Sequence, residues 1–222
     1  MTLFLNPIMM GKAGGLIKDP PVFVSASSAW SGSTLGSATT TVDKPANIQS
    51  GDLLIAYAFT SSGSFSSVPT DGWTVIENGA YWIAYKLAGN NEPATWAFQN
   101  STSGTYEAAV IIAYRGAKPP IFGTRAGANG YGPLTIPAIT TTVPNTRVLA
   151  IGTLRENSTT DRSISAFWSS NVTPVYSGPN NWDAYLAERL MEEPGDTGTS
   201  AIQANTSLVD VITGVLVALE PA

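Results

Sequence analysis

The sequence predicts an all-β protein, namely a two-sheet antiparallel sandwich that is jelly-roll-like, with pseudo-repeated halves and an extended N-terminal arm. Three observations support this fold class. Short apolar or alternating segments are separated by turn-forming clusters. Only 12% of the residues are charged, and Ser and Thr are abundant, which suits a pleated sheet. A similar order of strand patterns also returns in the second half of the chain.

Residues 1–19 differ from the rest, because they mix large apolar side chains with a Gly14-Gly15 break and keep no steady period. One interpretation is a frayed terminus or a first edge strand. The other is an arm that docks on a neighbouring subunit, since a free tail rarely exposes so many apolar side chains. No basic region precedes an apolar core, so a signal peptide is not expected. The side chains expected to bind the partner are Leu3, Phe4, Leu5, Ile8, Met9 and Met10.

After Pro20-Pro21 the pattern becomes strand-like, and Asp52–Thr60 is an apolar run of buried-strand length. Glu77-Asn78-Gly79 is a hairpin signal. The expected strands of the first half are Val22–Trp30, Asp52–Thr60, Trp73–Ile76, Tyr81–Ala88, Ala94–Phe98 and Ala108–Arg115. Those of the second half are Ala138–Val143, Arg147–Arg155, Val172–Tyr176, Trp182–Met191, Ser200–Asn205 and Val209–Glu220.

Two segments of the second half allow more than one interpretation. Trp182–Met191 contains the helix formers Ala, Leu, Glu and Arg, but we expect a strand because the first half has a strand at the matching place. The Gly-rich stretch Gly123–Gly132 lacks the Lys-Ser/Thr ending of a phosphate-binding loop, so we expect a surface loop.

The two halves are similar in three segments. Asp52–Ala56 resembles Arg147–Ile151, Tyr85–Leu87 resembles Glu188–Leu190, and Ile111–Arg115 resembles Leu216–Glu220. Such a repeat fits two small sandwiches, or one sandwich whose halves have related strand patterns. We expect one domain over residues 20–222, because 118–137 is a poor linker, with residues 1–19 as the arm.

An ordered series of short motifs resembles a known family. The motifs in this series are Gly51-Asp52-Leu53-Leu54, Gly72-Trp73-Thr74, Tyr85-Lys86-Leu87-Ala88, Glu92-Pro93-Ala94-Thr95-Trp96, Ala113-Tyr114-Arg115-Gly116, Ile139-Thr140-Thr141-Thr142 and Arg147-Val148-Leu149-Ala150. Over residues 22–220 the chain resembles a β-sandwich structural domain of tailed-bacteriophage virion proteins, which are tail-region or decoration proteins. The same domain is also found in some bacterial surface proteins. The resemblance implies a building block and no particular catalytic residue.

The residue types that are missing exclude much chemistry. The chain has no His and no Cys, so disulfides, Cys/His metal sites and catalytic sets such as Ser-His-Asp are excluded. Paired carboxylates of a glycosidase are not evident. We therefore expect no enzymatic activity, no cofactor and no metal. The net charge of −5 with dispersed Lys and Arg argues against nucleic acid, and no apolar run is long enough to span a membrane.

Aromatic and acidic clusters leave two binding hypotheses open. Exposed aromatics stack on sugar rings, and the residues proposed for glycan binding are Trp168, Tyr176, Asn181 and Trp182. Trp73, Trp82 and Trp96 fall inside strand patterns, which indicates core positions. The acidic segment 192–196 suggests either a solvated turn or, less readily, a calcium site.

These observations together predict a non-enzymatic bacteriophage virion protein on the outer surface of the particle. The arm docks on other virion proteins and the sandwich projects outward, in a tail, baseplate or fibre position in preference to capsid decoration. We expect a homo-oligomer, with a host surface glycan as a further candidate partner. The alternative is a carbohydrate-binding module of a bacterial surface protein.

Overall fold

The computed structural model describes residues 18–32, 37–103, 106–128, 134–156, 162–164, 169–177, 182–204 and 209–222. Within these ranges every regular element is a β-strand, and every pair of neighbouring strands is antiparallel. The predicted all-β sandwich is confirmed. None of these ranges forms an apolar helix of membrane-spanning length.

The first half folds into two facing sheets. One has the order β1-β8-β3-β6-β5 and the other β2-β7-β4, which is the strand order of a jelly roll except that β5 lies beside β6. The strands are β1 (Val22–Gly32), β2 (Ser37–Asp43), β3 (Leu53–Thr60), β4 (Phe65–Ser67), β5 (Thr74–Asn78), β6 (Tyr81–Leu87), β7 (Thr95–Ser103) and β8 (Tyr106–Arg115).

The second half repeats this order. One sheet runs β10-β19-β13-β16-β15, with β9 added beside β19, and it faces the short ladders β11-β18-β14 and β12-β17. The strands are β9 (Ile121–Phe122), β10 (Ala126–Ala128), β11 (Leu134–Ile136), β12 (Thr140–Thr141), β13 (Thr146–Glu156), β14 (Arg162–Ile164), β15 (Ser169–Ser177), β16 (Trp182–Met191), β17 (Gly195–Asp196), β18 (Ser200–Ala204) and β19 (Val209–Leu219).

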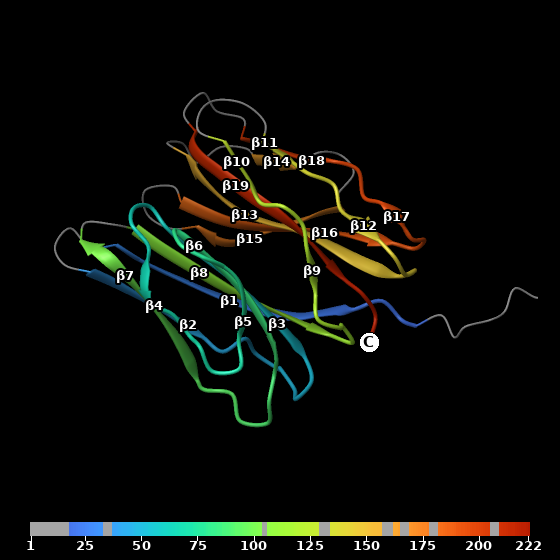
Figure 1. Ribbon diagram of the computed structural model, residues 1–222, viewed down its shortest axis with the longest axis horizontal. Helices are drawn as coiled ribbons and strands as arrows, with labels where there is room; N and C mark the ends of the chain where they lie inside the picture. The colour runs from blue at the N-terminus through green and yellow to red at the C-terminus, as the bar shows by residue number, and fades with distance from the viewer. Residues whose placement is uncertain are drawn as a thin grey trace, which may run out of the picture.

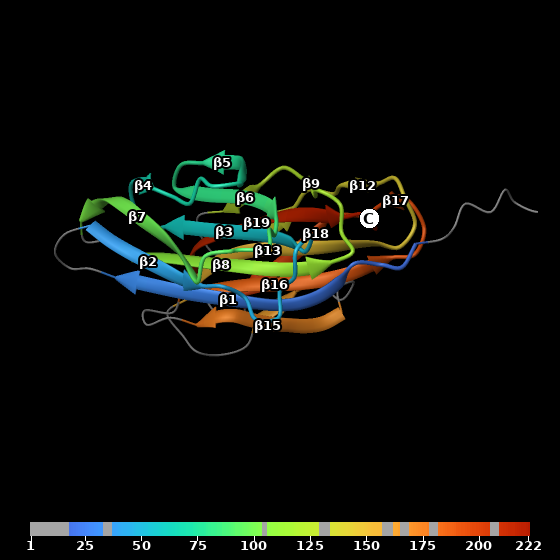
Figure 2. The same ribbon diagram turned by 90° about the horizontal axis from the view of Figure 1, so that it is seen from below.

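The two sandwiches pack against each other through their larger sheets (Figure 1), and the long strands of both run in roughly the same direction (Figure 2). Odd-numbered residues of β3, such as Ile55 and Tyr57, share one core cluster with Leu149 and Val217 of the second half. Even-numbered residues of β3, such as Leu54, pack inside the first sandwich instead. The sheets therefore stack in four layers, and central strands of the larger sheets, such as β3 and β8, are buried on both faces.

Burial on both faces explains the apolar runs in the sequence. All of β3 is buried, so its sequence carries no alternation between inner and outer faces. Without alternation, a sequence alignment of the halves cannot fix the register. The sequence match between Asp52–Ala56 and Arg147–Ile151 is indeed one residue out of step.

The strand ladders give the correct match. Leu54 lies opposite Lys86 and Ala113. Val148 occupies the same place in the second half, opposite Arg189 and Ala218. Leu54 therefore corresponds to Val148, whereas the sequence match paired Val148 with Leu53, which faces the other side of the sheet.

Most expected strands are present, and the differences concern short or polar ones. Trp182–Met191 is a strand, as expected, and the expected hairpin lies between β5 and β6. The prediction that Gly123–Gly132 is only a surface loop is wrong, because Ala126–Ala128 forms β10 against β19. The Thr-rich β2 was not expected, since Thr and Ser mark turns as readily as strands.

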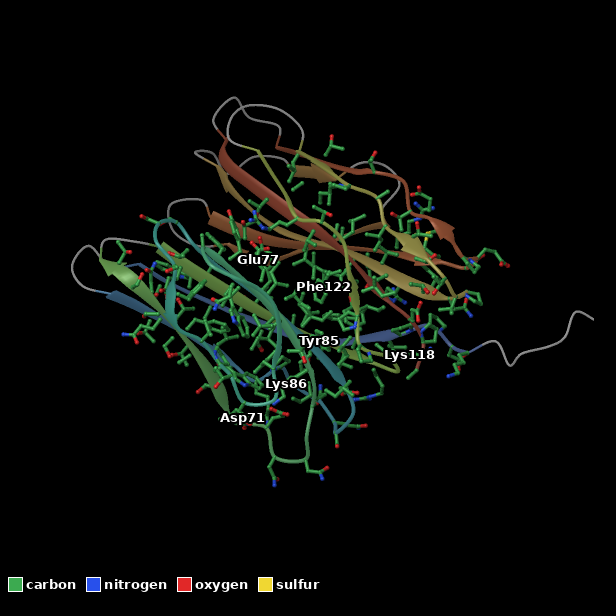
Figure 3. The ribbon with its side chains drawn as sticks, in the orientation of Figure 1. Asp71, Glu77, Tyr85, Lys86, Lys118 and Phe122 are labelled. Atoms are coloured by element: carbon green, nitrogen blue, oxygen red, sulfur yellow. The ribbon has the colours of Figure 1, made fainter. Side chains whose placement is uncertain are left out.

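Polar side chains also join the halves. Arg125 of the second half forms an ion pair with Glu77 of β5, with 2.8 Å between Nη2 and Oε1, and its guanidinium lies 4.2 Å from the ring centre of Tyr81. Tyr114 donates a hydrogen bond of 2.9 Å to Glu188. Figure 3 shows Glu77, Tyr85 and Phe122 along this junction, where the rings of Tyr85 and Phe122 are 6.2 Å apart.

Candidate functional site: a pocket beside the tryptophan cluster

The residues expected to form sites fall largely outside the described structure. The proposed arm residues Leu3, Phe4, Leu5, Ile8, Met9 and Met10 lie outside it, as do Trp168 and Asn181. Tyr176 is described only as a position in β15, opposite Ala184, and Trp182 as the first residue of β16, opposite Arg155. Both hypotheses, the docking arm and the glycan cluster, stay predictions.

The strand tryptophans of the first half form an aromatic cluster inside its sandwich. Trp73 packs edge-to-face on Trp82 and on Trp96, with ring centres 5.7 and 5.9 Å apart. Trp82 in turn packs edge-to-face on Phe98 at 5.4 Å. These contacts belong to the core, as expected for aromatics within strands.

A pocket of about 290 Å³ opens beside this cluster. One wall is the connection between β4 and β5, another is the start of β7, and Lys86 of β6 lies between them. The residues that line it are Val68, Pro69, Thr70, Asp71, Trp73, Lys86, Pro93, Thr95, Trp96 and Ala97. Figure 3 shows Asp71 and Lys86 near each other on the part of the first half that faces away from the second.

Lys86 holds the walls of the pocket in place. Its Nζ lies 2.9 Å from Glu92 Oε2, and the two side chains are only 10% and 6% exposed. The same Nζ donates to the backbone oxygen of Asp71 at 3.2 Å and lies 5.9 Å from the Trp73 ring centre. Glu92 accepts a second hydrogen bond, of 2.6 Å, from Gly89 N. Through these contacts Lys86 connects Glu92, the backbone of Asp71 and the ring of Trp73.

Gly72 lets the first loop approach Lys86. Its φ is +73°, a conformation that suits glycine, and a Cβ there would lie 3.2 Å from Lys86 Nζ. Both the backbone conformation and the space therefore favour glycine at this position.

The polar groups around the pocket differ in burial. Thr70, Asp71 and Thr95 are exposed. Trp73 is only 8% exposed, and its Nε1 has no hydrogen-bond partner among the described residues. A buried donor without an acceptor costs about 1–3 kcal/mol. The Nε1 of Trp82 is also without such a partner, but Trp82 does not line the pocket.

Sequence reasoning placed Trp73 and Trp96 in the core and missed the pocket. The signals available were Gly72, a lysine within the apolar strand Tyr81–Ala88, and the Glu92-Pro93 turn. None of them alone indicates a pocket, because its volume depends on how far the β4–β5 connection stands from β7.

Two buried carboxylates occur away from the pocket. Asp52 accepts hydrogen bonds of 2.9 Å from both Nε and Nη2 of Arg115, and one of 2.7 Å from Gln49 N. Glu107 of β8 is 1% exposed and accepts a hydrogen bond of 3.0 Å from Thr40 Oγ1. Each carboxylate has a hydroxyl, amide or guanidinium partner.

Acidic side chains do not gather into a metal site in the described ranges. Within the acidic segment 192–196, Asp196 Oδ1 accepts a 2.7 Å hydrogen bond from Gly198 N, which is the arrangement of a turn. Gly195–Asp196 forms β17, and this contact belongs to the turn that follows it.

Comparisons with known proteins give no relative: no protein-family model, no curated protein and no solved structure matches the chain.

Proposed function

We propose that the protein is a non-enzymatic structural protein of a tailed-bacteriophage particle, docked by residues 1–17 and carrying its double sandwich outward. The proposed position is the tail, baseplate or fibre region, with capsid decoration as the second choice. Its partners are other virion proteins and further copies of itself. The motif series of the sequence supports this proposal, together with one structural observation.

That observation concerns Lys18 and Pro21, which follow the proposed arm in the sequence and are held by side chains of the second half. Asn145 Nδ2 donates a hydrogen bond of 2.9 Å to Lys18 O, and Arg147 Nε donates one of 2.7 Å to Pro21 O. Arg147 is itself held by Glu188, with 2.8 Å between Nη1 and Oε1. Lys18 and Pro21, just before β1 of the first half begins, are thus hydrogen-bonded to the second half.

The C-terminus lies at the same end of the body (Figure 1). Ala222 N donates a hydrogen bond of 2.8 Å to Gly116 O, and Lys118 N donates one of 3.0 Å to Glu220 O. The first described residues and the C-terminus thus lie at one end of the described structure, which suits a protein that attaches by that end. Jelly rolls also occur in viral capsid and lectin domains, and the proposal agrees with this analogy.

Deletion of residues 1–17 in the phage or prophage that encodes the chain tests the proposal. We expect the truncated protein to remain folded, with the circular dichroism of the full chain, and to be lost from purified particles. The point variant Phe4→Ser should also reduce incorporation, whereas the control Thr2→Ser should not. Truncated protein that still copurifies with particles at the normal level contradicts docking by the arm.

A carbohydrate-binding module of a bacterial surface protein is the alternative from the sequence. It predicts that the isolated protein binds glycan and loses this binding on Trp182→Ala, while deletion of residues 1–17 leaves glycan binding unchanged. The virion hypothesis therefore requires residues 1–17 for incorporation into particles, whereas the carbohydrate-binding hypothesis requires Trp182 for glycan binding.

A further inference from the structure

We propose that the pocket beside Trp73 and Trp96 binds one pyranose ring of a neutral saccharide. None of its lining residues belongs to residues 1–17 or to the residues proposed for glycan binding around Trp182. It adds an activity that does not depend on where the protein is located.

The size of the pocket limits the ligand to a single ring. Its volume of about 290 Å³ lies at the lower end of the range for small-molecule sites. Its apolar lining consists of Val68, Pro69, Pro93, Ala97 and the two indoles. Such a lining accommodates the C–H faces of a sugar, which aromatic and proline rings contact readily.

The polar groups suit hydroxyl groups of a sugar. Thr70 and Thr95 bring hydroxyls that donate and accept, and Asp71 brings a carboxylate that accepts. Trp73 Nε1 is a buried donor that lacks a protein acceptor in the described ranges. Its Nε1 atom is out of the reach of solvent, so the hydrogen bonds of a bound sugar would come from Thr70, Asp71 and Thr95.

The charges favour a neutral ligand over an anionic one. Lys86 is the cation at the pocket, and its charge is already balanced by Glu92 at 2.9 Å. Asp71 is exposed at the rim, where it would repel a carboxylate or phosphate. The net charge of the chain, −5, acts in the same direction.

The pocket is also organised before a ligand arrives. The contacts of Lys86 with Glu92 and with Asp71 O connect its two loops. A site with fixed walls loses little conformational entropy on binding.

The test is a titration of the purified full-length protein with glucose, galactose, mannose and N-acetylglucosamine, followed by tryptophan fluorescence. We expect at least one sugar to give a saturable change with a Kd of about millimolar, which is typical of so small a ligand. Asp71→Asn and Thr95→Val should each weaken that binding about fivefold or more. Both side chains are exposed, so these variants should fold, which circular dichroism checks.

Two controls separate binding in this pocket from binding elsewhere on the protein. Glu193→Gln removes an exposed charge in the second half and should leave the Kd unchanged, and so should Trp182→Ala. Glucuronate should bind at least fivefold more weakly than the neutral sugar that binds most tightly if the site prefers neutral rings. The absence of a saturable change with all four sugars overturns the proposal. So do binding that neither pocket variant weakens and glucuronate binding as tight as that of the best neutral sugar.

Discussion

The hydroxyl of Tyr57 in β3 meets that of Thr213 in β19 at 2.8 Å, across the interface between the two sandwiches. Thr213 in turn lies 3.1 Å from Thr153 of β13, so three buried hydroxyls form one chain. Burial raises the pKa of Tyr57 well above its ordinary value, although the hydrogen bond with Thr213 acts in the opposite direction. The phenol therefore stays protonated, and the contact is a neutral hydrogen bond inside a largely apolar core.

Tyr57→Phe should lower the free energy of unfolding by about 1 kcal/mol, because it removes this hydrogen bond but leaves the ring and the Thr153–Thr213 pair. Since the two halves share one core, we expect a single calorimetric transition at a lower Tm. The control Tyr85→Phe, at a partly buried ring of the same interface, should change the free energy by less than about 0.5 kcal/mol. Two separate transitions in the wild-type protein would contradict a shared core.

The buried carboxylate of Glu107 should make the protein less stable as the pH rises. Burial raises the pKa of Glu107, and hydrogen bonds from Thr40 and its neighbours offset this effect only in part. Oε1 has no protein partner among the described residues. The folded state therefore holds the proton more tightly than the unfolded state. Its stabilising contribution is complete below the ordinary Glu pKa of about 4.3 and is lost as the pH rises through the folded value.

Glu107→Gln should remove this dependence. We expect the variant to be more stable than the wild type at pH 7 by about 1 kcal/mol or more, with a smaller difference near pH 4. Urea unfolding across this pH range measures it, with the exposed Glu193→Gln as a control that should change little. A variant that is less stable than the wild type at pH 7 would show that the charged form of Glu107 is well accommodated.

Asp52 should have the opposite pH dependence. Burial alone would raise its pKa, but hydrogen bonds from Arg115 and Gln49 N, with the charge of Arg115, bring the pKa below its ordinary value. The stabilisation is then present above the ordinary Asp pKa of about 4 and is lost as the pH falls through the lower folded value. Asp52→Asn should cost about 2 kcal/mol at pH 7, because a charge-assisted contact to Arg115 is lost.

The same urea series, extended to pH 2, measures this effect. The difference between wild type and Asp52→Asn should shrink as the pH falls below about 4. A difference that stays constant down to pH 2 would mean that the carboxylate charge contributes nothing and that only the shape of the side chain matters.

The sequence predicted well which segments form the long strands. Buried strands such as β3, β8 and β16 consist of apolar or alternating runs of strand length, and these patterns arise from the local chain. Short ladders such as β12 with β17 were harder to predict, because two residues carry too little pattern to be recognised. β10 was missed since its Ala-Gly-Ala sequence resembles a loop.

The sequence by itself determined the all-β class, the repeat of strand patterns, the core positions of Trp73, Trp82 and Trp96, and the absence of His and Cys chemistry. These properties depend on residue types and short-range periods. Only the tertiary structure decided that Leu54 corresponds to Val148, that the larger sheets stack against each other, and that a pocket lies beside Lys86. Each of these depends on distances between segments far apart in the chain, and doubly buried strands such as β3 have no polar face from which their register could be deduced.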